Sequence, residues 1–442
     1  MIEMERVKET IKGRSKEGNY IVYWMQSAQR VVHNHALKFA IDLANKRRLP
    51  LKVVFTVVEN FPNANTRHFK FMLEGLMETQ SALIELGCTF EWFLGEPEPI
   101  ILEYCHKASA CVMDDAYLSF ERHLKQEIKY KLACEVYEVS TNVVVPVEIA
   151  YPKAAYGAYV LRPSLLKRVD RFYKPFKMPN VDLKSTSSNI NPINLGLLNE
   201  LKCPHLDASN LFKGGFSEAI KHLNHFIEHH LIHYGEASND ASLDVTSKLS
   251  AYLHFGQISP ITIMEAVYQS GLPNEAFFEQ LIIRRELAFN YVFYERHYNE
   301  EITKWLPEWA YKTLDEHRQD LRDPTYTLEL LENAQTYDPF WNAAQRQLVT
   351  EGRIHNYMRM YWGKKIIEWS ATPEIAFAYM CYLNDKFALD GRDPNGYASI
   401  AWCFGKHDRP WGERLIFGKV RYMNQAGLKK KFKLESYLEK YR

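Results

Sequence analysis

Three hydroxyl side chains and a lysine stand close together in the middle of the chain. Thr246, Ser247, Lys248 and Ser250 fall within five residues, just ahead of an aromatic stretch with helical periodicity. Hydroxyl groups and the free N–H groups at the start of a helix bind phosphate well. The same residue types also cap ordinary helices, so this segment predicts either a phosphate site or a helix cap.

A second candidate for chemistry is an acidic residue in an apolar setting. Glu286 occurs in a segment of helical periodicity whose other residues are mostly apolar. A buried carboxylate needs a hydrogen-bonding or charged partner. Arg284 and Arg285 are the nearest candidates in the sequence, and a pair with either of them would have a structural role.

Three tryptophans form a third pattern. Trp362 and Trp369 lie seven residues apart on one predicted helix. At 100° per residue this is about 700°, close to two full turns, so both side chains face the same way. Trp341 lies on the preceding predicted helix. A stripe of this kind is usually core packing, but neighbouring indoles could also relay electrons.

Motifs of several other enzyme classes are absent. The sequence has no H-E-x-x-H, no G-x-S-x-G, no G-x-x-x-x-G-K-[ST] loop and no G-x-G-x-x-G after a predicted strand. The seven cysteines form no C-x-x-C pair, and the histidines of residues 222–233 point several ways around a predicted helix. We therefore expect reduced thiols and no metal site.

The elements that must position these residues change in kind along the chain. In the first 150 residues, β-branched and aromatic runs alternate with segments of helical periodicity. The predicted strands are residues 20–24, 51–58, 89–94, 110–113 and 143–147, and the predicted helices are residues 34–46, 68–86, 97–107 and 120–133. This alternation predicts an α/β fold with a doubly wound, mostly parallel sheet, whose ligand lies beyond the carboxyl ends of the strands.

A polar connection separates this part from a helical one. Residues 179–199 are rich in Ser, Asn, Pro and Thr, which predicts an exposed linker. Beyond residue 212 the strand signal disappears, and helical periodicity marks residues 217–234, 261–269, 276–298, 338–350, 354–369 and 373–383. We predict an α/β domain over residues 1–178, a linker over 179–210 and an all-α domain over 211–442.

Composition and charge limit the class of protein. Of the 442 residues, 46% are hydrophobic and 25% are charged, which excludes a disordered chain. No apolar stretch approaches the roughly 18 residues that cross a bilayer, and residues 1–16 lack a signal-peptide core, so we expect a cytoplasmic protein. The net charge is +1, yet residues 401–442 carry eleven Lys or Arg against four Asp or Glu. This surplus predicts either a polyanion-binding surface or a solvated basic tail.

Five ordered motifs in the second half resemble one family. They are T-S-K-L-S-A-Y-L-H-F-G-Q-I-S (246–259), R-R-E-L-A-F-N (284–290), H-N-Y-M-R-M-Y-W-G-K-K-I-I-E-W (355–369), L-N-D-K-F-A-L-D-G-R-D-P-N-G-Y (383–397) and F-G-K-V-R-Y-M-N (417–424). The first three are similar to the photolyase and cryptochrome superfamily. The last two look specifically like class II cyclobutane pyrimidine dimer (CPD) photolyases. The α/β pattern of the first half agrees, so the resemblance covers nearly the whole chain.

The resemblance implies a light-driven lyase that repairs DNA by electron transfer from excited, reduced FAD to a flipped-out pyrimidine dimer. It assigns cofactor binding to Tyr234, Asn239, Thr246, Ser247, Lys248, Leu249, Ser250, Arg359, Asn384 and Asp390. Thr246, Ser247 and Ser250 would hold the pyrophosphate. Asp390 would accept from flavin N3, and Asn384 would lie beside N5 unless it only caps a helix. Such a reaction needs a cofactor and a dry site rather than a nucleophile or a metal.

For the DNA, the resemblance implies that Glu286 hydrogen-bonds the edge of the dimer and that Met360 and Trp402 wall its pocket. Phosphate contacts are expected from Lys406, Arg409, Arg414, Lys419, Arg421, Lys429, Lys430 and Lys431. In the family's electron relay, Trp362 would stand next to the FAD, Trp341 in the middle and Trp369 outermost.

Two alternatives stay open in the sequence. The turn after the first predicted strand matches many class II sequences at Arg30 and Asn34 but differs at nearby positions. An antenna chromophore in the α/β domain, either a deazaflavin or a folate, is therefore left open. The rival function is a cryptochrome-like FAD photoreceptor without repair activity. Damaged DNA is the expected partner, with no membrane, no protein partner and a monomeric state.

Overall fold

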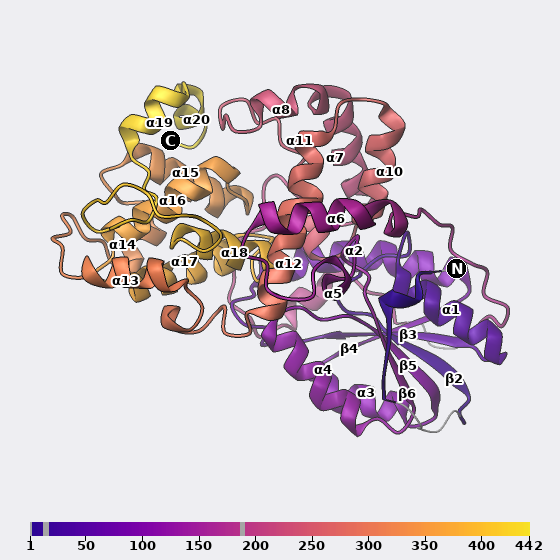
Figure 1. The fold of residues 1–442 in the computed structure, drawn as a ribbon. Helices are drawn as coiled ribbons and strands as arrows, with labels where there is room; N and C mark the ends of the chain where they lie inside the picture. Colours follow the sequence, from indigo (N-terminus) through magenta and orange to yellow (C-terminus); the bar gives the residue numbers. More distant parts are fainter. Residues whose placement is uncertain (1, 12–16, 186–190) are drawn as a thin grey trace.

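A mostly parallel sheet occupies the first part of the chain. The structure is a computed structural model that describes residues 2–11, 17–185 and 191–442. Its strands pair in the order β1-β6-β5-β2-β3-β4; β1 is antiparallel to β6, and the other neighbours are parallel. Figure 1 shows this sheet at the lower right. The strands are β1 Val7–Ile11, β2 Tyr20–Trp24, β3 Leu51–Val57, β4 Thr89–Leu94, β5 Ala108–Asp114 and β6 Glu135–Val139.

Helices cover both faces of the sheet. Ile21 and Tyr23 of β2 belong to the buried cluster that includes α1 and α2, whereas Val22 and Trp24 pack with α3 and α4. This alternation follows from the two-residue period of a strand. The covering helices are α1 His35–Arg47, α2 Thr66–Leu86, α3 Pro97–Cys105 and α4 Ser119–Lys131. The prediction of a doubly wound α/β fold is confirmed.

The strand prediction fails at one side of the sheet. The sequence pattern predicts neither β1 nor β6, because charged residues such as Lys8 and Glu138 interrupt their apolar character. Residues 143–147 are predicted as a strand, but residues 143–146 are irregular and residue 147 begins α5 (Val147–Ala150). The buried guanidinium of Arg6 donates to the carbonyl oxygens of Val143 at 3.1 Å and Val144 at 2.5 Å. A side chain therefore occupies the backbone groups that a neighbouring strand would use.

The chain passes from the sheet to the helices through a packed segment. α6 (Ala158–Phe172) buries Leu161 and Leu165 in a core shared with later helices. The predicted linker is not fully exposed, because Val181, Ile193 and Leu197 are buried in the core on the α2 side of the sheet. It contains a short 3₁₀ turn, η2 (Leu195–Asn199). Its residues 186–190 lie outside the described residues, and the domain limits stay a prediction.

Helices make up the regular structure of the described residues after α6. The prediction of a helical second part is confirmed, although the predicted helix over residues 276–298 is divided into α11, a π-helical turn (η4) and α12. None of the described helices is both long and apolar enough to cross a membrane. The elements are α7 Phe216–His229, η3 Leu231–His233, α8 Tyr234–Ala237, α9 Ser250–His254, α10 Pro260–Ser270, α11 Glu275–Phe278, η4 Glu279–Arg284, α12 Arg285–Tyr294, η5 Ile302–Lys304, α13 Glu308–Glu316, α14 Leu328–Glu332, α15 Pro339–Glu351, α16 Asn356–Trp369, α17 Pro373–Phe387, α18 Pro394–Cys403, α19 Gln425–Lys431 and α20 Glu435–Lys440.

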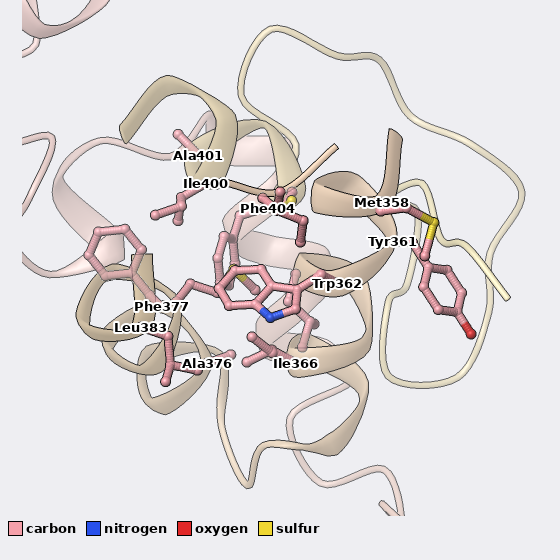
Figure 2. Packing of buried hydrophobic residues seen from close by; sticks show 14 of the residues in the cluster. Met358, Tyr361, Trp362, Ile366, Ala376, Phe377, Leu383, Ile400, Ala401 and Phe404 are labelled. Carbon is pink, nitrogen blue, oxygen red and sulfur yellow. The ribbon is translucent and has the colours of Figure 1, made fainter. Parts of the chain in front are cut away.

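The core of the helical part lies between α16, α17 and α18. Figure 2 shows Trp362 of α16 among apolar side chains that include Phe377 of α17, Ile400 of α18 and Phe404, the residue after α18. The helices approach closely at Gly363, where a Cβ would lie 2.7 Å from the sulfur of Cys403. Packing of this density fixes the positions of the side chains that α16 and α18 present on their other faces.

The turn after β2 is hydrogen-bonded to the helical part of the chain. The carboxylate of Asp114, at the end of β5, accepts from the backbone N–H groups of residues 26–28 at 3.0 to 3.1 Å. Arg30 then donates to the carbonyl oxygen of Gly256 at 2.8 Å. Gly256 has a φ of +64°, and a Cβ there would lie 1.9 Å from the carbonyl oxygen of Ser27. This contact therefore requires glycine.

Candidate active site

A cavity of about 540 Å³ lies between the segment before α9, the turn η4, and helices α12, α16 and α18. Many of the predicted site residues line it, although they come from segments far apart in the sequence. On the cofactor side these are Tyr234, Ser247, Leu249, Ser250, Arg359 and Asp390, and on the substrate side Met360, Trp402 and Arg421. The π-helical turn contributes Gln280, Leu281 and Arg284. Turns of this kind often occur at functional sites.

The hydroxyl-rich segment divides its side chains between the cavity and the protein interior. Ser247, Leu249 and Ser250 line the cavity. Thr246 instead accepts a hydrogen bond from Arg353 at 3.2 Å, and the ammonium of Lys248 lies 3.1 Å from the carboxylate of Asp244. The N-cap of α9 is Leu249, and no side chain caps this helix. The hydroxyls of Ser247 and Ser250 are therefore not an ordinary helix cap and are available to a ligand, whereas that of Thr246 is held by Arg353.

Arg359 joins two of the predicted cofactor residues. Its guanidinium donates to the side-chain oxygen of Asn384 at 2.6 Å and lies 3.5 Å from the carboxylate of Asp390. The Asn384 amide donates to Asp385 and lies inside α17, so it is not a helix C-cap. Asn384 is buried and does not line the cavity, whereas Asn239 is exposed on the turn after α8.

Two cations lie near the indole ring of Trp402. The ammonium of Lys364 lies 5.0 Å and the guanidinium of Arg421 5.7 Å from its ring centroid. Lys364 is fully buried and donates to the carbonyl oxygen of Cys403 at 2.5 Å. Burial lowers the pKa of Lys364 to about 8. The two cations hold Trp402 in place by charge–ring attraction.

Four of the predicted phosphate contacts fall into two groups. Arg409 and Arg421 are exposed and flank the ring of Trp411, at 5.6 and 4.7 Å from its centroid. Lys429 and Lys431 are exposed on α19, where they lie near aromatic rings of α15 and α16. Arg421 lines the cavity, and the other three do not.

Glu286 is buried, as its apolar neighbours indicate, but its partners differ from those expected. Its carboxylate accepts from the backbone N–H of Val144 at 2.5 Å and of Val145 at 3.3 Å. Arg284 instead pairs with Glu279, and Arg285 donates to a backbone carbonyl. Burial raises the pKa of Glu286 to about 7, against the two N–H donors and the nearby Arg285, which lower it. Glu286 does not line the cavity, and its contact with a dimer stays a prediction.

The three tryptophans lie in sequential contact, with Trp341 between Trp362 and Trp369. The rings of Trp362 and Trp341 are stacked, with centroids 6.4 Å apart and planes 4° from parallel. Trp341 meets Trp369 edge to face at 5.6 Å. Trp369, predicted as outermost, is only 1% exposed, and its own neighbours are Tyr326 and the exposed Tyr337. Trp362 does not itself line the cavity.

A second cavity, of about 170 Å³, lies beyond the carboxyl ends of β2 and β3. Its lining includes Gln26, Ser27 and Gln29 from the turn that follows β2. This is where the doubly wound fold predicts a ligand. His254 lines both cavities, and its Nδ1 lies 3.1 Å from the carboxylate of Asp393.

The sequence patterns miss three contributors to the site. Arg353 contacts the hydroxyl-rich segment, Lys364 supports Trp402, and His254, which pairs with Asp393, lines both cavities. Lys364 carries the same signal as Glu286, a charged residue within a mostly apolar helix. No local pattern links Arg353 to residue 246, because the two lie 107 positions apart. Among the described residues, no group of three or more acidic, histidine or cysteine side chains could hold a metal ion.

Comparison with known proteins identifies the family of this chain. The family model described as DNA photolyase matches residues 21–180. The chain is 42% identical to the deoxyribodipyrimidine photo-lyase of Methanothermobacter thermautotrophicus over 100% of this chain and 99% of that protein. The proteins of the same name from Potorous tridactylus and Arabidopsis thaliana are 37% and 35% identical, each over 95% of this chain and over 80% and 88% of their own lengths.

Solved structures agree at the level of the fold. A bacterial class III photolyase from Agrobacterium tumefaciens superposes with a TM-score of 0.74 at 18% identity, covering 98% of this chain and 88% of that one. A photolyase from Sulfolobus tokodaii, solved with two FAD molecules, gives a TM-score of 0.72 at 17% identity, covering 95% and 89%. Because relatives at 35% to 42% identity extend over nearly its whole length, this chain belongs to the deoxyribodipyrimidine photo-lyases of the photolyase and cryptochrome superfamily.

Proposed function

We propose that this protein repairs cyclobutane pyrimidine dimers in DNA under light, with reduced FAD as its cofactor. One observation carries the proposal: predicted cofactor residues and predicted substrate residues line the same cavity. An electron passes efficiently only between groups that are held close together, and a shared cavity meets this requirement. Class II is the subgroup that the motifs of residues 383–397 and 417–424 favour.

The residues present fit FAD. The cavity volume of about 540 Å³ lies within the range of small-molecule sites, roughly 300 to 1,000 Å³. Ser247 and Ser250 offer hydroxyl donors to a pyrophosphate, and Tyr234 and Leu249 offer apolar surface. When bound and reduced, FAD supplies the light-driven electron that opens the cyclobutane ring.

The polar groups beside the flavin site would be fixed before the cofactor binds. Arg359 already holds the Asn384 oxygen and the Asp390 carboxylate. Fixed dipoles of this kind stabilise a developing charge without having to reorient. We therefore assign Arg359 and Asp390 to the isoalloxazine ring, with Asn384 held in position through Arg359.

On the substrate side, Met360 and Trp402 would form the walls that face a flipped-out dimer. Both line the cavity, and a dimer presents apolar ring faces that stack on such side chains. Arg421, at the exposed rim beside Trp402, would contact a phosphate. A contact from Glu286 to the dimer would require its carboxylate to give up a backbone partner.

A relay and an antenna would extend this function. Trp362, Trp341 and Trp369 would pass an electron inward to oxidised FAD, since their rings lie in sequential contact. An antenna chromophore, a deazaflavin or a folate, would use the cavity beside Gln26 and Ser27. That cavity holds about 170 Å³, which is below the usual range for a whole ligand, so part of such a pigment would extend outside it.

Repair is tested by illuminating the reduced protein with DNA that contains thymine dimers and measuring the thymine recovered. We expect recovery in light and none in the dark. A protein that retains FAD but recovers no thymine would instead support the cryptochrome-like receptor. A protein that retains no FAD would contradict both functions.

A further inference from the structure

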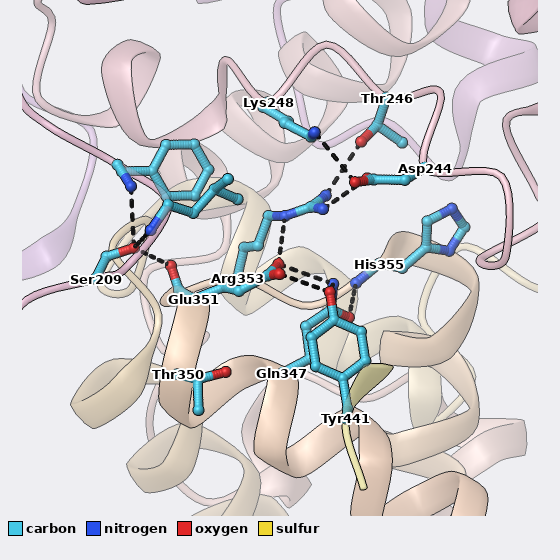
Figure 3. A network of polar contacts seen from close by, with 12 residues as sticks. Ser209, Asp244, Thr246, Lys248, Gln347, Thr350, Glu351, Arg353, His355 and Tyr441 are labelled. Carbon is cyan, nitrogen blue, oxygen red and sulfur yellow. Dashed lines mark hydrogen bonds and ion pairs between the residues drawn. The ribbon is translucent and has the colours of Figure 1, made fainter. Parts of the chain in front are cut away.

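A buried polar network connects the hydroxyl-rich segment to the C-terminal helix. Figure 3 shows its members, which come from the loop before α9, the end of α15, the chain after α15 and the residue after α20. Arg353 and Glu351 lie at its centre, and both are nearly inaccessible, at 8% and 5% exposure. Buried charges persist only where they are fully paired, so these contacts hold their elements together.

The loop before α9 needs such support. Asp244 and Lys248 have φ values of +48° and +57°, in the left-handed region that side-chain-bearing residues adopt at a cost. Residues 244 to 248 also lack a helical or strand hydrogen-bond pattern. Their conformation must therefore be maintained by contacts from elsewhere.

Arg353 supplies those contacts with two of its nitrogens, and its third nitrogen binds Glu351 of α15. Nη2 donates to the Asp244 carboxylate at 2.6 Å, Nη1 to the Thr246 hydroxyl at 3.2 Å, and Nε to the Glu351 carboxylate at 3.0 Å. The planar guanidinium fixes the direction of each bond. Thr246 is thereby turned inward, while its neighbours Ser247 and Ser250 line the cavity.

The other oxygen of Glu351 ties this arrangement to the end of the chain. The hydroxyl of Tyr441 donates to it at 2.6 Å, and the ammonium of Lys440 lies 3.2 Å away. Gln347 donates both to Glu351 and to the Tyr441 hydroxyl, at 3.2 and 3.1 Å. Tyr441 is itself only 7% exposed. Its hydroxyl therefore orients the carboxylate that orients Arg353.

We propose that Arg353 and Tyr441 are positioning residues that hold the phosphate-binding loop, and that the C-terminal helix thereby controls retention of FAD. The proposal rests on the FAD site proposed above. Arg353, Lys248 and Lys440 give three positive charges against two from Asp244 and Glu351. One of the three cations, Lys248, lies between Ser247 and Ser250 in the sequence, and a positive net charge suits an anionic pyrophosphate.

The test measures release of FAD from the purified holoprotein by the rise in flavin fluorescence after dilution. Arg353→Met should release FAD at least about tenfold faster, because it removes three hydrogen bonds around a charged group. Tyr441→Phe keeps the ring and removes the hydroxyl, and should release FAD about threefold faster. The absorbance spectrum of the bound flavin should stay unchanged in both variants, since neither residue lines the part of the cavity assigned to the ring.

Thr350→Val is the matched control. Thr350 is next to Glu351 and exposed, and its hydroxyl donates to a carbonyl one turn earlier in α15. This variant should release FAD at the parent rate. Parent-like release from both Arg353→Met and Tyr441→Phe would overturn the proposal, and if Arg353→Met fails to fold, Tyr441→Phe decides. A parent protein that binds no FAD would instead contradict the proposed function.

Discussion

At the scale of single residues, the surroundings of Trp362 and Trp341 suit electron transfer. The indole of Trp362 donates to Gln345 at 2.9 Å, and that of Trp341 donates to the backbone oxygen of Trp362 at 3.0 Å. Both partners are neutral, and both rings are at most 2% exposed. Trp402, by contrast, lies beside two cations, which make an electron harder to remove from its ring.

Trp362→Phe should abolish light-driven reduction of oxidised FAD yet leave repair by chemically reduced protein nearly intact. The change breaks the proposed relay at its first member while keeping most of the buried volume. The lost packing and the unpaired Gln345 oxygen should cost about 1 to 3 kcal/mol of stability. Flavin absorbance under illumination and thymine recovery after chemical reduction measure the two activities separately.

Two outcomes would reject this assignment. Normal photoreduction in the variant would remove Trp362 from the relay. Parallel loss of photoreduction and of repair by reduced protein would mean that Trp362 mainly shapes the flavin site. Trp341→Phe provides a second variant at the next position, with the same expected pattern.

For Glu286, the sequence pattern predicts the burial of the side chain but not its hydrogen-bond partners. Its apolar neighbours correctly indicate burial, because a helix face of this composition faces a core. Its partners are backbone groups 141 and 142 positions away. Their arrangement depends on how Arg6 shapes the segment around Val144, and no local sequence signal records that contact.

At the scale of elements, the basic C-terminal region consists of two surfaces with different expected roles. Arg421 lines the cavity, whereas Lys429 of α19 does not line it and lies near Phe340 of α15. A cation at the cavity rim contacts DNA where the dimer flips out. A cation farther along the surface contacts any phosphate equally.

Arg421→Gln should therefore reduce the preference for damaged over undamaged duplex, while Lys429→Gln should weaken both affinities by the same factor. Each removes one positive charge, so the pair is matched. Each lost phosphate contact should also make the slope of log affinity against log salt shallower by about 0.9. Titrations of both duplexes at several salt concentrations measure these effects, and equal loss of preference in the two variants would contradict the division into two surfaces.

Helices with a regular periodicity of apolar residues are well predicted from the sequence. Residues 339–351, 356–369 and 373–387 form helices close to their predicted limits, because apolar residues recur at helical spacing. The run of valines at 143–145 is misleading, since β-branched composition alone does not create a strand without a neighbour to pair with. Many of the cofactor and substrate residues within the matched motifs reach one cavity, although Thr246, Glu286 and Asn384 do not line it. Supporting residues such as Arg353 become evident only in three dimensions.

At the scale of the whole molecule, buried histidines predict sensitivity to acid. Burial lowers the pKa of His33 and His355 to about 4, and it lowers those of His35 and His68 well below the ordinary value. In the unfolded chain these groups titrate near 6.5. Unfolding therefore takes up protons between about pH 6.5 and 4, and the free energy of unfolding should fall as pH falls through that window.

Denaturant unfolding at several pH values measures this loss, with a contribution of up to about 1.4 kcal/mol per pH unit from each histidine. His33→Gln should remove one such contribution and flatten the curve. His123→Gln is the control, because that side chain is 77% exposed and should not change the slope. A free energy of unfolding that is constant from pH 6.5 to 4.5 would contradict the prediction.

The contact between Arg30 and Gly256 has a consequence for synthesis of the chain. The two residues are 226 positions apart, and the glycine carbonyl is among the acceptors of the buried guanidinium. A ribosome makes the N-terminal part first, so the whole strand sequence emerges long before residue 256 does. During that interval Arg30 lacks one of its native acceptors, and water must take its place. The sheet of a nascent chain can therefore form early, but its ligand-facing turn reaches its final shape only when the helical part arrives.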